Sequence, residues 1–283
     1  MNLQEKLKKA SEYVRSRSKI QARIGLVLGT GMNQLPESLH QRIEIPYEDI
    51  PHLSLKKQSF HQGKLYIGKL NNPQKQPVLI FQGRLHHYEG YSMEDIVFPI
   101  RLAYKLGVQG LIMTNAAGSL VPSLPPGDVM LASDHINLIP DSPVRGEESP
   151  SLGSRFVDLA EAYNTQWRKI LKKKALGLKL NLSEGVYVGV PGPHLETQAE
   201  YRYLAQIGGQ AVGMSTIPEV IAARQLNMNC AMLSVISDAG YQVPLKPIII
   251  EDILNRVQKV EPQLNQLILN SLPELEKNLN PKT

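Results

Sequence analysis

Residues 23–29 read Arg-Ile-Gly-Leu-Val-Leu-Gly, a short apolar run that ends in glycine and continues into Thr30 and Gly31. An apolar run of this length, bounded by turn residues, is typical of a strand that is buried on both faces. The glycines at its carboxyl end indicate a tight loop. The stretch therefore predicts a buried strand followed by a tight loop, which is the repeating unit of parallel sheets.

Similar apolar runs recur along the chain and alternate with helical patterns. We find no internal repeat, no low-complexity segment and no linker, so one domain fits better than two. The alternation predicts an α/β domain with a largely parallel sheet covered on both faces. Further strands are predicted at Lys64–Leu70, Pro77–Phe81, Val108–Thr114, Asp128–Ala132, Gly185–Val190 and Asn229–Ile236; helices at Met93–Gly107, Arg155–Lys174, Thr197–Ala205, from Pro218, and from Pro247 to Leu269; and a long functional loop at Asn137–Gly153.

Composition is that of a globular protein. Of the 283 residues, 42% are hydrophobic and 20% are charged, which excludes a disordered or fibrous chain. Lys and Arg number 31 against 26 Asp and Glu, giving a net charge of +5. This modest excess permits nucleic acid binding but also suits a small anionic substrate such as phosphate. The one cysteine, Cys230, cannot form an internal disulfide, so we expect a reducing, cytoplasmic compartment.

The N-terminal segment has apolar residues at helical spacing, namely Leu3, Leu7, Ala10 and Val14, without a continuous apolar core. We expect a helix packed on the domain rather than a signal peptide or a membrane-surface helix. No apolar stretch approaches the roughly 20 residues that a membrane helix needs. No membrane partner is therefore expected.

Polar and small residues follow several of the predicted strands. In open α/β sheets, ligands bind beyond the carboxyl ends of the strands, so these clusters are where chemistry is expected. The clusters are Gly29-Thr30-Gly31, Gly83-Arg84-Leu85-His86, Asn115-Ala116-Ala117-Gly118, Gly213-Met214-Ser215 and Ser237-Asp238.

The strongest chemical signal lies in the segment Gln82–Gly90. The planar guanidinium of Arg84 matches two phosphate oxygens, and His86 can donate beside it; a salt-bridged surface loop is the alternative. Thr30 between two glycines can contribute to an anion site, or belong to a plain tight turn. Glu196 can cap the helix that follows it, or accept a hydrogen bond from a ring N–H.

Several other kinds of site are excluded by spacing. The third glycine of a dinucleotide fingerprint is missing after Gly31, and no Gly-Lys-Ser/Thr P-loop occurs. No His-Glu-x-x-His motif or paired cysteines occur, so no metal site is predicted, and no Gly-x-Ser-x-Gly elbow supports a serine hydrolase. Two alternatives from other classes are a non-catalytic RNA-binding module, which lacks basic residues interleaved with aromatics, and a dinucleotide-dependent oxidoreductase with a broken fingerprint.

Taken together, the motifs resemble the trimeric purine nucleoside phosphorylase family over nearly the whole chain. The resemblance implies a single α/β domain over residues 1–283, with a mixed central sheet flanked by helices and assembled as a homotrimer. It also implies phosphorolysis of purine nucleosides in purine salvage, with inorganic phosphate as co-substrate and no metal, organic cofactor, nucleic acid or membrane. The matching pieces are Gly29-Thr30-Gly31, His61, Gln82–Tyr91, Thr114–Gly118, Gly127-Asp128, Asp134–Leu138, Gly192–Glu200 and Val212–Glu219.

The resemblance also implies roles for individual residues. His86, Glu196 and Asp238 are the implied catalytic groups, and the loop with Leu152 is expected to reach a neighbouring subunit. The implied phosphate-binding residues are Thr30, His61, Arg84, Leu85, His86, Ala116 and Ser215. The implied nucleoside-binding residues are Tyr88, Leu195, Glu196, Val212, Met214, Ser237, Asp238 and Ile250.

Two departures from the family pattern bear on the substrate. Phosphorylases that act on 6-oxopurines typically have Thr-Asn where this chain has Ser237-Asp238, and an ionised Asp cannot donate to O6. Ile250 stands where the family often has a His that reaches the sugar 5′-hydroxyl. Glu196 favours a 6-oxopurine, whereas these two residues favour adenine and an apolar 5′ group. The alternative function is therefore a 5′-methylthioadenosine or 5′-methylthioinosine phosphorylase.

Overall fold

The sheet at the centre of the fold is mixed, and its strands run in the order β2-β3-β4-β1-β5-β8-β7-β6-β9. The computed structural model describes residues 1–283 except 54, 56–62, 73, 147–151 and 281–283. The strands are β1 (Ile24–Leu28), β2 (Leu39–Pro46), β3 (Lys64–Leu70), β4 (Pro77–Gln82), β5 (Gly110–Ser119), β6 (Val129–Asn137), β7 (Leu182–Gly189), β8 (Ala211–Gly213) and β9 (Asn229–Ala239). The helices are α1 (Leu3–Arg17), α2 (Met93–Lys105), α3 (Thr165–Leu178), α4 (Gln198–Gln206), α5 (Ile217–Gln225) and α6 (Ile250–Lys277), with short 3₁₀ turns at Leu35–Ser38, Tyr47–Asp49 and His87–Glu89.

The strand β5 connects the two halves of the sheet. It pairs in parallel with β1 and β9, while its last residues pair antiparallel with β8. Because β9 also pairs with β6, the strands β5, β8, β7, β6 and β9 form a closed ring. In this ring Gly118 is in register with Val212 on one side and with Asp238 on the other.

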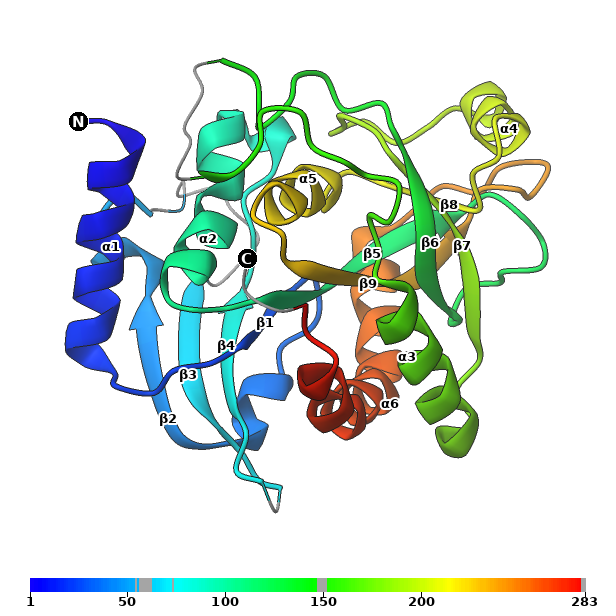
Figure 1. The fold of residues 1–283 in the computed structure, drawn as a ribbon. Coiled ribbons are helices and arrows are strands. Elements are labelled where there is room, and N and C mark those ends of the chain that lie inside the picture. The colour runs from blue at the N-terminus through cyan, green and yellow to red at the C-terminus, as the bar shows by residue number, and fades with distance from the viewer. Residues whose placement is uncertain (54, 56–62, 73, 147–151, 281–283) are drawn as a thin grey trace.

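Helices cover both faces of the sheet, as the alternating pattern predicts (Figure 1). The helices α1, α2 and α5 share one buried core with one face, whereas α3 and α6 share a second core with the other face. The predicted N-terminal helix packs on the domain through Leu7, Ala10 and Val14, which are all buried. The prediction of an α/β domain with a mixed, helix-flanked sheet is confirmed. No helix in the described ranges is long and apolar enough to cross a bilayer.

Four sequence predictions about element boundaries are wrong. Residues 115–118 and 237–238 lie inside β5 and β9 rather than in turns, since these two strands pair over their whole lengths. The helix predicted at Arg155–Lys174 begins only at Thr165, where the Asn164 side chain accepts from the Trp167 N–H and caps it. The last helix begins at Ile250 and extends to Lys277, because its later turns are buried in the second core. The strands β2 and β8 were not predicted.

Candidate functional site

Arg84 follows β4 and lies at the carboxyl end of the parallel strands, where ligand chemistry is predicted. Its side chain is only 2% exposed. Nη1 donates to the Thr114 carbonyl oxygen at 2.7 Å and lies 3.4 Å from the Ser215 hydroxyl. On the other edge of the guanidinium, Nη2 lies 3.2 Å from Oε2 of Glu219, and Nε donates to Oε1 at 3.4 Å. Three elements, β5, the β8–α5 turn and α5, therefore hold this guanidinium in place.

The turn between β8 and α5 places hydroxyl groups at the N-terminus of a helix. Thr216 has a φ of +68°, which is rare for a β-branched residue, and its side chain does not cap α5. Instead its hydroxyl accepts from the Asn115 amide at 3.0 Å and lies 3.1 Å from the Ser215 hydroxyl. The N-terminal N–H groups of a helix attract anions. Together with Arg84, this turn is suited to hold an anion.

The Gly29-Thr30-Gly31 loop is fixed to β5. The Gly29 N–H donates to the Thr114 hydroxyl at 3.0 Å. A Cβ at Gly29 would lie 2.6 Å from the Thr114 carbonyl oxygen, so only glycine fits there. Because Arg84 and Gly29 share Thr114 as a partner, the half-buried Thr30 is brought to the same end of β5 as Arg84.

His86, Tyr88 and Glu89 form one cluster beside this site. The His86 backbone N–H donates to the Glu89 carboxylate at 2.9 Å, and its Nδ1 lies 3.3 Å from the same oxygen. The His86 and Tyr88 rings stack with centroids 4.7 Å apart. Burial lowers the pKa of His86, against the effect of Glu89, and thus favours the neutral imidazole. Burial also raises the pKa of Tyr88 to about 12, so its phenol stays a hydrogen-bond donor at neutral pH.

Two carboxylates, Glu196 and Asp238, form the second half of the site. Burial raises the pKa of Glu196; the charge of Asp238 acts in the same direction, and a hydrogen bond with Tyr201 acts against it. Burial likewise raises the pKa of Asp238, against the Ser237 hydroxyl, which lies 2.6 Å from Oδ1, and the charge of Arg256. The other oxygen, Oδ2, is buried and has no hydrogen-bond partner among the described residues. Because the charge of Asp238 acts on Glu196, the two carboxylates lie near each other, as a shared site requires.

The remaining predicted site residues differ in accessibility. Leu85, Val212 and Ser237 are buried, and Val212 packs in the small core around α4, which favours a packing role for its side chain. Ala116 and Met214 are half-buried. Leu195 and Ile250 are exposed, at 43% and 53%. His61 lies outside the described residues.

Leu152 lies in the loop that the resemblance assigns to contact with a neighbouring subunit. Its side chain is 2% exposed and packs in the protein's own first core. The exposed apolar residue of this segment is Phe156, at 87%. Contact of this loop with a neighbouring subunit stays a prediction.

Four residues around the site were not predicted as members of it: Glu219, Tyr187, Tyr201 and Arg256. Tyr187 accepts from the Ser215 N–H at 3.4 Å, and Arg256 donates to the Ser237 carbonyl oxygen. The signal for Glu219 was available, since it is a lone carboxylate in the otherwise apolar start of α5. A buried carboxylate needs a partner, so the apolar surroundings of Glu219 in the sequence could have suggested that it pairs with a buried cation such as Arg84.

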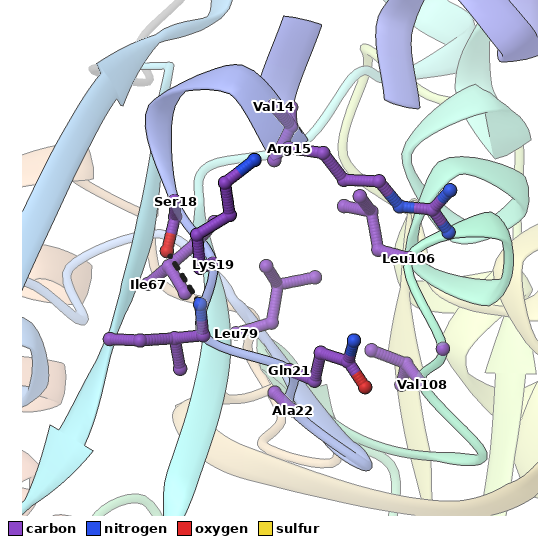
Figure 2. Close-up of a pocket in the computed structure, with 12 residues that line it drawn as sticks. Val14, Arg15, Ser18, Lys19, Gln21, Ala22, Ile67, Leu79, Leu106 and Val108 are labelled. Carbon is purple, nitrogen blue, oxygen red and sulfur yellow. Dashed lines mark hydrogen bonds between the residues drawn. The ribbon is translucent and has the colours of Figure 1, made fainter. Parts of the chain in front are cut away.

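A cavity of about 300 Å³ lies elsewhere, at the amino ends of the strands (Figure 2). Its lining comes from the end of α1, the α1–β1 connection and the turn after α2, and includes Ile67, Leu79 and Val108. Ala22 lies just before β1 and Val108 just before β5, so the cavity is at the amino ends of these strands, whereas Arg84 is at the carboxyl ends. In the described part of the chain, no group of three or more His, Cys, Asp or Glu side chains could hold a metal ion.

Comparison with known proteins places this arrangement in context. A family model described as the phosphorylase superfamily matches residues 23–273. Purine nucleoside phosphorylase 1 of Geobacillus stearothermophilus is 38% identical over 272 residues, covering 96% of this chain and 98% of that protein. The Bacillus subtilis protein of the same name is 35% identical, covering 94% and 97%. Schistosoma purine nucleoside phosphorylase in complex with hypoxanthine superposes with a TM-score of 0.89 at 31% identity, covering 97% and 98%. The Schistosoma mansoni enzyme in complex with adenosine gives 0.89 at 32%, with the same coverage.

Proposed function

We propose that this chain catalyses the reversible phosphorolysis of purine nucleosides, because it belongs to the phosphorylase superfamily and, within it, to the purine nucleoside phosphorylases. Phosphate attacks the anomeric carbon of a purine ribonucleoside or deoxyribonucleoside. The products are the free base and the sugar 1-phosphate. One observation carries this proposal: the buried guanidinium of Arg84 lies beside the Ser215 hydroxyl, in the same fold as the two buried carboxylates Glu196 and Asp238.

Phosphate binding is assigned to the end of β5 and the start of α5. Arg84 supplies charge, the hydroxyls of Thr30 and Ser215 donate, and the backbone at Ala116 approaches closely; Leu85 and His61 belong to the same proposed cradle. A neutral His86 donates one N–H without adding charge. Breaking the glycosidic bond leaves positive charge on the sugar, and the phosphate dianion below it stabilises that charge in the transition state.

The base is assigned to the two carboxylates. Glu196 accepts from the purine N1–H, and Asp238 lies at the edge that carries N7 and the 6-substituent, beside Ser237. Because burial raises the pKa of Asp238, its protonated form can donate to N7 as the base leaves. Tyr88 and Met214 are the proposed sugar contacts, and Leu195 covers the base.

A second candidate is a 5′-methylthioadenosine or 5′-methylthioinosine phosphorylase. The observation that favours it is apolar exposure at the start of α6, where Ile249 is 54% and Ile250 is 53% exposed. An apolar 5′ substituent would cover such side chains, whereas a 5′-hydroxyl finds no partner in an isoleucine.

The assembly and the setting of the reaction are also proposals. We infer that residues 1–283 form one domain that assembles as a homotrimer, in which Phe156 contributes an apolar contact to a neighbouring subunit. The 87% exposure of Phe156 supports this, and sedimentation of the purified protein tests it. The buried, unpaired Cys230 is compatible with purine salvage in the cytoplasm.

The test is base release from inosine, guanosine, adenosine, methylthioadenosine and methylthioinosine, each with and without inorganic phosphate. Chelator-treated protein should release base only when phosphate is present, since phosphate is the proposed co-substrate and no metal or organic cofactor takes part. Equal release in phosphate-free buffer would overturn the proposal. The panel also separates the two candidates, because the second predicts a clear preference for the methylthio substrates.

A further inference from the structure

The ion pair formed by Arg84 and Glu219 is enclosed within the protein. Both side chains are almost fully buried, at 2% and 3% exposed. Tyr47 and Tyr187 lie around the pair: the Tyr47 hydroxyl donates to the Gly83 carbonyl oxygen at 2.9 Å, and the pKa of each tyrosine responds to both charges. An enclosed ion pair interacts strongly because little water screens it.

The orientation of the guanidinium decides which of its N–H groups can reach a ligand. Nε and Nη2 face Glu219, and one N–H of Nη1 donates to the Thr114 carbonyl oxygen. Nη1 also lies 3.4 Å from the Ser215 hydroxyl, so the end of the guanidinium formed by Nη1 and Nη2 is the part that the contacts with Glu219 leave open. Within the described residues Nη2 has the ion contact but no aligned hydrogen bond. Glu219 therefore turns one defined edge of Arg84 toward the anion site.

Charge balance gives Glu219 a second effect. A buried guanidinium without a counter-charge is strongly destabilising, and Glu219 supplies that charge in the protein without ligand. A phosphate dianion would be a second anion beside the same cation. Glu219 therefore neutralises part of the positive charge of Arg84 and weakens its attraction for phosphate.

We propose that Glu219 is a positioning residue that orients Arg84 for the reaction and at the same time weakens phosphate binding by neutralising it. This inference rests on the proposed function. Glu219 touches no reacting atom. Glu219 lowers the affinity of the site for phosphate in the ground state, and it holds the guanidinium in the orientation that the transition state needs.

The test uses Glu219→Gln, with inorganic phosphate as the probe in calorimetry and in steady-state kinetics. Without Glu219, phosphate becomes the counter-charge for Arg84, so its Kd should fall about tenfold. Because the guanidinium loses its orientation, kcat should fall at least about tenfold, with the KM for inosine within about twofold of wild type. Glu184→Gln is the matched control: it removes a carboxylate that pairs with Arg168 and Lys172 on the surface, and should change none of these values.

A phosphate Kd that rises or stays the same in Glu219→Gln would overturn the proposal. A merely structural role would lower the folded fraction and kcat without tightening phosphate binding. If the variant folds only when phosphate is present, the proposal is supported, because phosphate then replaces the missing counter-charge. If it does not fold at all, Glu219→Asp decides, since it keeps the charge but shifts the carboxylate. Its kcat should fall with phosphate Kd within about twofold of wild type, and an unchanged kcat would overturn the proposal.

If wild-type protein neither binds phosphate nor requires it for base release, the proposed function fails and this inference fails with it. If the wild type requires phosphate but Glu219→Gln does not tighten its binding, only the inference fails. The two failures are therefore distinguishable.

Discussion

The substitution Asp238→Asn should change which purine this enzyme prefers, and the structure allows the effect to be worked out. Oδ1 of Asp238 already lies 2.6 Å from the Ser237 hydroxyl. Oδ2 is buried and without a hydrogen-bond partner among the described residues, so it is the oxygen that we expect to bond a base. Burial raises the pKa of this carboxyl above its ordinary value of 3.8, so its protonated form persists to higher pH.

The sign of the pH dependence follows from what each form can do. Below its pKa the protonated carboxyl donates to O6 or N7 of a 6-oxopurine; above it, the carboxylate accepts from a 6-amino group and repels O6. The ratio of kcat/KM for inosine over adenosine should therefore fall as pH rises through this pKa. One hydrogen bond to a charged group contributes about 1.5–3 kcal/mol, so the ratio should change roughly ten- to hundredfold. In Asp238→Asn the amide always donates, which raises the ratio and removes its dependence on this titration.

The assay is kcat/KM for inosine and adenosine between about pH 5 and pH 9 in wild type and Asp238→Asn. Glu184→Gln serves as a control, because Glu184 is a carboxylate of β7 that pairs with Arg168 and Lys172 on the surface. The carboxylate form of Glu196 acts against adenosine, since neutral adenine has no N1–H to offer. The reasoning is refuted if the wild-type ratio does not depend on pH and Asp238→Asn leaves it unchanged.

Three further predictions address phosphate, the 5′ group and the core. Arg84→Ala should lower kcat/KM for phosphate by about 10²-fold or more, and unchanged phosphate saturation and turnover would contradict the assignment. Ile250→Ser should reduce the preference for methylthioadenosine over adenosine by about fourfold, since burial of a methylene-sized group contributes about 0.8 kcal/mol, and an unaltered preference would place Ile250 outside the 5′ pocket. Trp167→Phe should lower the free energy of unfolding in urea by about 1–3 kcal/mol, because the fully buried Trp167 donates to the Leu275 carbonyl oxygen at 3.1 Å; an unchanged midpoint would show that this bond contributes nothing.

Local sequence patterns predicted the strands and helices that are specified by their own apolar runs and capping residues. The apolar runs at residues 24–28 and 64–70 are strands with nearly the predicted ends, and the box at Ser92 and Asp95 starts α2 as expected. These elements are specified by neighbouring residues, through periodicity and capping. β2 was missed because it is an edge strand with few buried positions, and β8 because it is only three residues long.

Elements that depend on distant partners were predicted less well. Asn115–Gly118 has turn-forming residues, yet it is a strand because β8 and β9 pair with it. Gly118 serves close packing there: a Cβ at this position would lie 2.8 Å from Oδ2 of Asp238. The α6 helix continues through Pro262 and Pro273, since Leu264, Leu272 and their neighbours are completely buried. Tertiary packing overrides local propensity in both cases.

The site shows the same division between local and distant information. A cation in a turn after a strand is enough to predict that Arg84 binds an anion, and the structure places it at the expected edge of the sheet. Its counter-ion Glu219 is 135 positions away, on a helix whose place depends on the order of β5, β8 and β9. The sequence can therefore indicate which side chain is the candidate to bind phosphate, whereas the counter-charge that this side chain already has is a property of the folded packing. If Glu219 acts as proposed, the phosphate affinity of this enzyme depends as much on α5 as on the loop that carries Arg84.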